Sequence, residues 1–259
     1  MRQSRMKLIL ITSLLILVGW ASAAIIFNEV PDDWAEQSGR DAGFVLDQLR
    51  VHGAERTTRQ DILSALDVED GIPLMSIDLV KLRERMEALS WVKAATVARR
   101  LPNELSISLE ERVPFALWQL EGSVALIDPE GAIITDQGLH EFSDRLLLVG
   151  EGVPESANDL VYLLSLSPEI GGRIRAAVRI SDRRWDLIFD NGIRVKLPAS
   201  GEKYNPDMAW SQFVLQEEKH RLLDREVSVI DLRQQDRMVL RVLPEGLKNL
   251  KKNKIGKGV

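Results

Sequence analysis

The chain has 259 residues, of which 45% are hydrophobic and 28% are charged, and its formal net charge is −5 at neutral pH. This mild negative charge argues against bulk nucleic-acid binding. The absence of cysteine excludes disulfides, thiolate metal sites and a cysteine nucleophile. The three histidines, His52, His140 and His220, lack the spacing of metal ligands, so neither a metal site nor a cofactor site is expected.

Residues 8–27 form a run of twenty residues without a single charge. As a helix this run would span about 30 Å, the thickness of the hydrocarbon core of a bilayer. Basic residues precede the run, whereas residues 28–43 are mainly acidic. Since basic flanks stay in the cytoplasm, residues 1–7 are predicted to be a cytoplasmic tail. Everything after residue 27 is predicted to lie on the opposite side of the membrane, outside the cytoplasm.

The same N-terminus also fits a cleaved secretory signal. Residues 21–23 (Ala-Ser-Ala) before Ala24 form an A-x-A cleavage pattern behind a basic start and an apolar run. An uncleaved anchor is favoured, because the apolar run continues through Phe27 and the bulky Trp20 stands at the start of the small residues. Both interpretations export residues 28–259.

Residues 44–112, which follow a polar linker at residues 28–43, predict an α+β unit. A first strand is expected at residues 44–51. Thr57, with Gln60 three residues later, fits a capping box and predicts the start of a short helix.

A second helix of this unit is predicted to start at Asp78, which can cap it. Its apolar side chains recur at intervals of three and four residues, at Leu79, Leu82, Met86 and Leu89. Two strands follow at residues 91–99 and 105–111, and apolar and polar residues alternate strictly in the second. The order β-α-α-β-β predicts two helices on one face of a three-stranded sheet.

Residues 113–243 predict a second, mostly β domain with one long helix, and the lysine-rich residues 244–259 predict a disordered tail. A shorter helix is expected at residues 158–167, and Asn205-Pro206 predicts the start of the long helix, which runs to about Leu223. Asn191-Gly192 predicts a type I′ hairpin turn. The expected strands are residues 115–120, 123–127, 132–135, 177–180, 185–189, 193–197, 227–232 and 238–243.

The strand at residues 238–243 is the last one predicted, and nothing after it can extend the sheet, because Pro244 lacks an N–H and the tail is rich in lysine. It is therefore expected to leave an edge with open main-chain donors and acceptors. The alternative from the sequence alone is an ordinary edge that Arg237 and Arg241 protect from pairing.

Catalytic motifs are missing from the sequence, which has no P-loop, no HExxH and no GxSxG pattern. Residues 200–203 match the S-x-x-K pattern of penicillin-binding serine enzymes, but the accompanying S-x-N and K-T-G elements are absent. Gly201 would weaken the required helix, and the Asn205-Pro206 pair marks a helix that starts later. The chain is therefore predicted not to be an enzyme.

A series of short motifs occurs in a fixed order between residues 51 and 114. These motifs are Val51-x-Gly53, Ile62-Leu63-x-Ala65-Leu66, Gly71-x-Pro73-Leu74, Leu89-Ser90-Trp91-Val92, Arg100-Leu101-Pro102-Asn103-x-Leu105 and Glu110-Glu111-Arg112-x-Pro114. In this order and spacing the region resembles the POTRA domain of the bacterial cell-division family FtsQ/DivIB. The second domain resembles the same family more loosely, at Asp128-x-x-Gly131, Trp185-x-Leu187 and Val229-Ile230-Asp231-Leu232-Arg233.

This resemblance implies a non-enzymatic, single-pass type II protein of the cell inner membrane, with most of the chain in the periplasm at the division septum. Such a protein would be a scaffold that recruits and links early and late division proteins through its periplasmic domains. The implied partners are FtsB-like and FtsL-like small coiled-coil division proteins, and the FtsB-like protein would add a strand to the last strand. The implied partner-binding residues are Arg183, Arg233, Met238, Val239, Leu240, Arg241 and Val242.

The chain departs from the family after Arg233, where an aromatic residue is common and this sequence has Gln234. The alternative function is that of a secreted periplasmic binding protein or hydrolase with a cleaved signal peptide. An intact N-terminus in the membrane fraction would support the scaffold, and a mature chain starting at Ala24 would support the alternative.

The charge asymmetry around residues 8–27 gives a topological prediction. A reporter that is active only outside the cytoplasm, fused after Asp41, should be active, because the basic flank keeps residues 1–7 inside. The same reporter fused after Lys7 is the control and should be silent. Silence of the fusion after Asp41 would contradict the predicted orientation.

Overall fold

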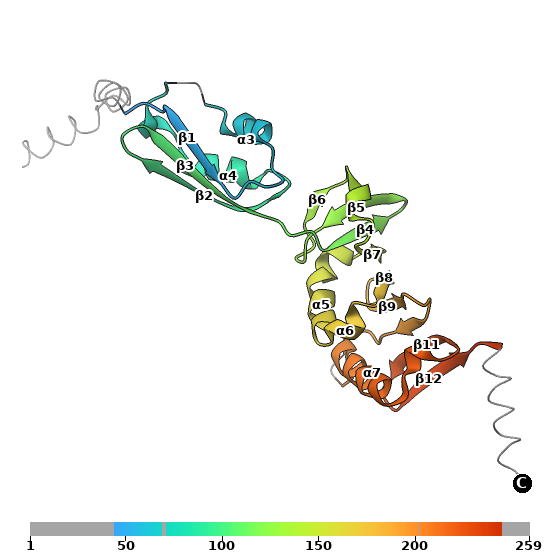
Figure 1. Cartoon of the computed structure of the whole chain (residues 1–259). Helices are drawn as coiled ribbons and strands as arrows, with labels where there is room; N and C mark the ends of the chain where they lie inside the picture. The colour runs from blue at the N-terminus through green and yellow to red at the C-terminus, as the bar shows by residue number, and fades with distance from the viewer. Residues whose placement is uncertain (1–43, 69–70, 202, 245–259) are drawn as a thin grey trace, which may run out of the picture. The chain divides into compact units, whose positions relative to one another are not determined.

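The computed structural model describes residues 44–68, 71–201 and 203–244, which form two units divided between Glu111 and Arg112 (Figure 1). The predicted anchor, the linker and residues 245–259 of the predicted tail lie outside the described residues. Within the described ranges no helix is both long and apolar enough to cross a membrane.

The N-terminal unit has the predicted β-α-α-β-β order. Its described strands form a three-stranded sheet in the order β1-β3-β2, in which β1 runs parallel and β2 antiparallel to β3. The main elements are β1 (Gln48–His52), α3 (Arg59–Leu66), α4 (Leu79–Glu87), β2 (Val92–Arg100) and β3 (Glu104–Glu111).

The first strand is shorter than the prediction of residues 44–51, because the chain just before it pairs elsewhere. The Phe44 carbonyl accepts from Leu74 N–H at 2.8 Å, and Leu46 N–H donates to the Ile72 carbonyl at 2.9 Å. Residues 44–46 thus pair with the segment that joins the two helices. Beyond β1, Gly53 has a φ of 79°, and a Cβ at this position would lie 2.0 Å from the Leu109 carbonyl oxygen, so only glycine fits the close approach to β3.

The two helix starts of this unit were predicted with different success. The Asp78 side chain accepts from Val80 N–H at 3.0 Å and Lys81 N–H at 3.2 Å, which confirms it as the cap of α4. The prediction of Thr57 as the cap of the first helix was wrong by one residue. Thr58 is the N-cap of α3 and accepts from Asp61 N–H at 3.1 Å.

The core of the N-terminal unit lies between α4, α3 and the inward face of the sheet. Leu82 and Met86 of α4 are fully buried, and Leu79 and Leu89 pack beside them, so the predicted apolar stripe is confirmed. The opposing side chains include the alternating residues of β3 and two residues of α3, namely Leu105, Ile107, Leu109, Ile62 and Leu66.

Thr57 does not cap α3, because its N–H and hydroxyl are hydrogen bonded to Glu111 at the end of β3. The Glu111 carboxylate accepts from the Thr57 N–H and hydroxyl, both at 2.7 Å, and from the N–H groups of Glu55 at 3.1 Å and Arg56 at 2.9 Å. Burial raises the pKa of Glu111, but these hydrogen bonds outweigh burial, and the pKa lies below its ordinary value. The carboxylate therefore fixes the loop before α3 to the end of β3.

The C-terminal unit contains a nine-stranded sheet among its described residues, in the order β12-β11-β10-β9-β8-β7-β4-β5-β6. Its helices are α5 (Val153–Ser165), α6 (Pro168–Gly171) and α7 (Pro206–His220), with the short 3₁₀ helices η2 (Leu139–Phe142) and η3 (Leu222–Asp224). The strands are β4 (Ala116–Leu120), β5 (Ser123–Ile127), β6 (Ile133–Thr135), β7 (Leu146–Val149), β8 (Ile174–Ile180), β9 (Arg184–Phe189), β10 (Arg194–Lys196), β11 (Val227–Gln234) and β12 (Arg237–Val242).

Several features of this unit differ from the prediction. Helix α7 ends at His220 rather than at about Leu223, and β8 starts at Ile174 rather than at residue 177. Strand β7 was not predicted, because its short run of leucines has no alternation and is recognisable only by its parallel partners β4 and β8. Helix α5 starts at Val153 rather than at residue 158, since Pro154 fits the first turn of a helix. The turn at Asn191-Gly192 is not type I′, because only Gly192 of the pair has a positive φ.

Helices α5 and α7 contribute to the same core as one face of the sheet. Trp210 and Phe213 of α7 are fully buried, and their ring centroids are 5.5 Å apart. The ring centroid of Phe213 also lies 6.1 Å from that of Phe189 in β9. The predicted cap of α7 is confirmed, since the Asn205 side chain accepts from Met208 N–H at 2.9 Å. The helix therefore starts after Lys203, as the Asn205-Pro206 pair predicted.

A buried aspartate explains the Asp128-x-x-Gly131 motif. The Asp128 carboxylate accepts from Glu130 N–H at 3.0 Å and Ala132 N–H at 2.8 Å, and it forms an ion pair with Arg112 at 2.7 Å. Gly131 has a φ of 86°, and a Cβ there would lie 1.9 Å from the Pro154 carbonyl oxygen. The turn therefore requires both the buried carboxylate and the glycine.

The buried stripe of α4 gives a stability prediction. Leu82→Ala should destabilise the N-terminal unit by about 2–5 kcal/mol, because it removes a fully buried side chain and leaves a cavity. Denaturant melts of the wild type and the variant measure the loss. Val80→Ala, at a residue that is 60% exposed on the same helix, is the control and should change little. A loss below about 1 kcal/mol for Leu82→Ala would contradict the assigned core position.

Glu111 gives a pH prediction. Its folded pKa lies below the ordinary value of 4.5, so its contribution to stability is present above about pH 4.5 and is lost as the pH falls through the folded pKa. Glu111→Gln should cost about 1–3 kcal/mol at neutral pH, and the difference from wild type should shrink below about pH 4.5. Glu110→Gln is the matched control, because Glu110 is exposed. A difference that stays constant with pH would contradict this role of the Glu111 carboxylate.

Candidate functional site

Strand β12 is the outer strand at one end of the C-terminal sheet (Figure 1). Among the described residues it pairs with β11 alone, antiparallel, with Leu240 opposite Ile230 and Val239 opposite Asp231. Its other side has no strand beside it in the part of the chain that the structure describes. The expected edge is therefore present, and it starts one residue before the predicted strand, at Arg237.

The hydrogen-bond pattern defines which main-chain groups of β12 are open. Leu243 N–H donates to the Glu226 carbonyl at 2.8 Å, and the Arg241 carbonyl accepts from the Ser228 hydroxyl at 3.3 Å, so odd-numbered residues of this segment point toward β11. Because the direction alternates along a strand, the even-numbered residues point outward. The outward N–H and C=O groups are those of Met238, Leu240 and Val242.

The side chains of β12 are unusually exposed for a hydrophobic strand. Val239 is 50% exposed and Leu240 is 38% exposed, whereas Met238 and Val242 are partly buried and pack against the core. Arg241 is exposed as well. An edge that combines open main-chain groups with exposed apolar side chains can bind an extended polypeptide.

A row of charged residues crosses the sheet toward this edge. The register places Asp186 of β9 beside Lys196 of β10, Lys196 beside Asp231 of β11, and Asp231 beside Val239 of β12. Asp186 is almost fully buried, and its Oδ1 lies 3.6 Å from the Arg184 guanidinium. Acidic and basic side chains thus alternate up to the last strand.

Arg233 is held next to this row by Asp231. The Arg233 guanidinium donates to the Asp231 carboxylate at 2.6 Å and 2.9 Å. This hydrogen bonding lowers the pKa of Asp231, and the Asp231 carboxylate raises the pKa of Arg233. The Arg233 side chain remains 45% exposed, so its charge is positioned but still accessible to a partner carboxylate.

Arg183 lies in the turn between β8 and β9, where Ser181 and Asp182 both have positive φ. It is exposed and directly precedes β9, whose Asp186 is in the same row as Asp231. The register therefore brings Arg183 and Arg233 to the same end of the sheet. The expectation that both bind one partner requires this arrangement. The two arginines differ in one respect, because Arg233 has an ion-pair partner and Arg183 has none within the described ranges.

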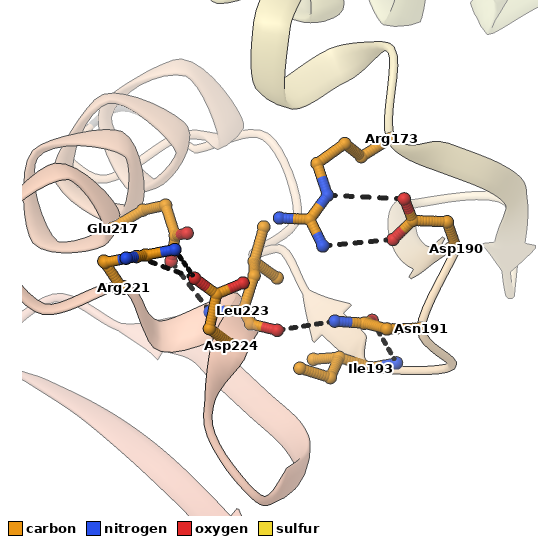
Figure 2. A network of polar contacts seen from close by, with 8 residues as sticks. All are labelled: Arg173, Asp190, Asn191, Ile193, Glu217, Arg221, Leu223 and Asp224. Carbon is orange, nitrogen blue, oxygen red and sulfur yellow. Dashed lines mark hydrogen bonds and ion pairs between the residues drawn. The ribbon is translucent and has the colours of Figure 1, made fainter.

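A polar network fixes the position of β11 and hence of β12 (Figure 2). The Asn191 side chain donates to the Leu223 carbonyl at 2.6 Å and accepts from Ile193 N–H at 3.1 Å. Asn191 lies in the β9–β10 turn, and Leu223 lies in η3 between α7 and β11. Because β10 and β11 are parallel, this contact anchors the crossover connection where both strands start.

The second part of the network lies beside this contact. Arg173 faces Asp190, with N–O distances of 3.2 Å and 3.4 Å, and Glu217 of α7 accepts from Leu223 N–H at 2.9 Å (Figure 2). Hydrogen bonding to Arg173 lowers the pKa of Asp190, and the same bond raises the pKa of Arg173. The β9–β10 turn is therefore held from both sides.

The sequence analysis missed the partner of Arg233 and this network. The signal for the first was available, because residues two apart in a strand share a face, which places Asp231 and Arg233 side by side. Nothing in the sequence connects Asn191 to Leu223, since the contact depends on the crossover. Within the described ranges no group of three or more His, Cys, Asp or Glu residues is placed to hold a metal ion.

Known proteins match both units of the chain. Residues 44–112 match the family model "POTRA domain, FtsQ-type", and residues 116–233 match "Cell division protein FtsQ/DivIB, C-terminal". The cell division protein FtsQ of Rhizobium meliloti is 34% identical over 83% of this chain and 68% of its own length. The FtsQ proteins of Caulobacter vibrioides and Bartonella bacilliformis are also 34% identical, over 77% and 80% of this chain and 65% and 66% of their own lengths.

A solved structure, the major extracytoplasmic domain of the division protein DivIB from Geobacillus stearothermophilus, matches with 13% identity and a TM-score of 0.29. That match covers 44% of this chain and 98% of the solved chain. The curated relatives are longer, and the chain aligns with about two thirds of their length. The order of the two matched domains and the identity to these relatives show that the chain belongs to the FtsQ/DivIB family of cell-division proteins.

Proposed function

We propose that the chain is a non-catalytic, membrane-anchored scaffold of the division septum, which binds a small coiled-coil partner by strand addition at β12. The observation that carries this proposal is the open edge of β12, with the outward main-chain groups of Met238, Leu240 and Val242 next to a positioned Arg233. Family membership supports the role in cell division.

Main-chain pairing supplies affinity in this arrangement, because an added strand satisfies donors and acceptors that are otherwise bound to water. The exposed side chains of Val239 and Leu240 would also be removed from water. Burial of apolar surface stabilises a complex by about 25 cal/mol for each Å². These terms do not depend strongly on the partner sequence, so specificity must come from side chains.

The arginines at this end of the sheet supply that specificity. A partner carboxylate that approaches Arg233 can form a charge-assisted hydrogen bond without first ordering the guanidinium, because Asp231 already holds it. Arg183 offers a second cation at the same end of the sheet. An FtsB-like partner with an acidic residue near its added strand fits this site.

The alternative of a secreted periplasmic binding protein or hydrolase is not favoured, because both domains match a family of division proteins. The proposal also places the chain in the inner membrane, with most of its residues in the periplasm. The charges on either side of residues 8–27 support this orientation.

The proposal predicts the effect of a proline at the edge. Leu240→Pro removes an outward N–H but leaves the ladder to β11 intact, so the domain should fold while capture of the FtsB-like partner falls at least tenfold. Pull-down of the partner from the same organism with the full-length chain measures capture, and a thermal melt measures folding.

Two variants make this test specific. Leu240→Ala keeps the N–H and should retain most of the capture. Val239→Pro removes an N–H that points toward β11, so it should lower the melting temperature instead. Undiminished capture by a folded Leu240→Pro chain would contradict strand addition at β12.

A further inference from the structure

The turn between β8 and β9 has a strained backbone. Ser181 and Asp182 both lie in the left-handed region, with φ of 51° and 50°. Arg183 N–H donates to the Ile180 carbonyl at 3.2 Å and closes the turn. Two consecutive residues with positive φ are typical of a type I′ turn, for which Asn-Gly is the favoured pair. Residues with a Cβ adopt this conformation at an energetic cost, so it persists only where the surroundings hold it.

Two glycines allow the loop between β7 and α5 to approach this turn closely. A Cβ at Gly152 would collide with the Asp182 carboxylate, and a Cβ at Gly150 would lie 2.7 Å from the Arg179 carbonyl oxygen. Gly152 is also the N-cap residue of α5, so the Asp182 carboxylate lies beside the start of that helix, where a negative charge is favourable. The loop and the turn therefore fit together only with glycine at both positions.

Arg179 of β8 holds the turn from the other side. Its guanidinium donates to the Asp182 carbonyl at 3.3 Å, and its Nε lies 3.6 Å from the Asp182 carboxylate. The same guanidinium lies over the ring of Trp185, 5.2 Å from the ring centroid, and only 15% of the Arg179 side chain is exposed. Because Trp185 is buried in the core, these contacts connect Asp182 to the packed part of the unit.

Arg183 follows directly after this turn. Its side chain is exposed and forms no hydrogen bond or ion pair within the described ranges, so its direction depends on the backbone from which it starts. Arg233 differs, because the Asp231 carboxylate orients its guanidinium directly. The binding of a partner carboxylate to Arg183 therefore depends on how firmly the turn is held.

We infer that Asp182 is a positioning residue, which holds the β8–β9 turn so that Arg183 presents its charge to the partner. This inference rests on the proposed function and adds to that binding site a residue outside the edge strand. A turn that served only to reverse the chain would form with less strain from Asn-Gly. The Asp182 carboxylate instead fixes the turn to the start of α5 and to Arg179, which reduces the entropy that is lost when Arg183 binds.

The affinity of the full-length chain in lipid nanodiscs for the FtsB-like partner, measured by fluorescence anisotropy, tests this inference. Asp182→Gly should weaken binding about fivefold, because the turn loses its contacts. The melting temperature should stay constant or rise, because glycine relieves the left-handed backbone and the Asp182 side chain is 63% exposed. Asp182→Asn keeps a side chain against Gly152 and tolerates the left-handed region, so it should retain most of the affinity. Unchanged or tighter binding by Asp182→Gly would overturn the inference.

A double-mutant cycle determines whether Asp182 acts through Arg183. Arg183→Ala should weaken binding about tenfold, because a charge-assisted hydrogen bond is lost. In the Arg183→Ala chain, Asp182→Gly should weaken binding by less than about twofold more, since the cation that it positions is gone. An equal loss in both backgrounds would show a merely structural role and would also overturn the inference.

The contact with Gly152 has a matched control at Gly122. Gly152→Ala should displace the Asp182 carboxylate and weaken binding about as much as Asp182→Gly, whereas Gly122→Ala should not. Gly122 also has a positive φ, of 88°, but a Cβ there meets nothing within 4 Å. Equal affinities of the two alanine variants would count against the inference. Loss of capture by Leu240→Pro with unchanged binding by Asp182→Gly overturns this inference alone, whereas full capture by the Leu240→Pro and Arg183→Ala chains contradicts the proposed function as well.

Discussion

The parallel pairing of β10 with β11 is the constraint on which the C-terminal edge depends. Parallel strands cannot be joined by a tight turn, so the chain leaves the sheet through α7 and must return at the correct position. The bond from Asn191 to the Leu223 carbonyl joins the turn before β10 to the segment before β11. If the return were displaced by one residue, the faces of β11 and β12 would be exchanged and Arg233 would point into the core.

Ion pairs around the edge orient side chains more than they stabilise the fold. An exposed pair such as Arg233 with Asp231 contributes about 0–1 kcal/mol, because water screens both charges. Its effect is to restrict one long, flexible side chain, which reduces the entropy lost when a partner carboxylate binds. The Glu111 carboxylate differs, because it accepts from several main-chain N–H groups at once, and its loss would leave those donors unpaired.

Local signals in the sequence were sufficient for most of the N-terminal unit. The Asp78 cap and the Leu82 and Met86 stripe are confirmed because each depends on residues within two helical turns. Errors appear where a distant residue decides the outcome. Thr57 was assigned to the helix cap because its competing partner, Glu111, lies 54 residues away. Strand β7 was missed because its partners are parallel. The edge position of β12 could be predicted because Pro244, which follows it closely, has no N–H to donate to a strand ladder.

The edge at β12 would select its ligand by charge and by its ability to form a strand. Its outward main-chain groups lie beside an exposed face that carries Arg233. Main-chain pairing alone would accept many extended segments, so the discrimination between segments has to come from side chains. A segment with a carboxylate near Arg233 would form a charge-assisted hydrogen bond to a guanidinium that Asp231 already holds. A segment without that carboxylate could still pair with β12 but would lose this contribution, so the position of one acidic residue would decide between otherwise similar strands.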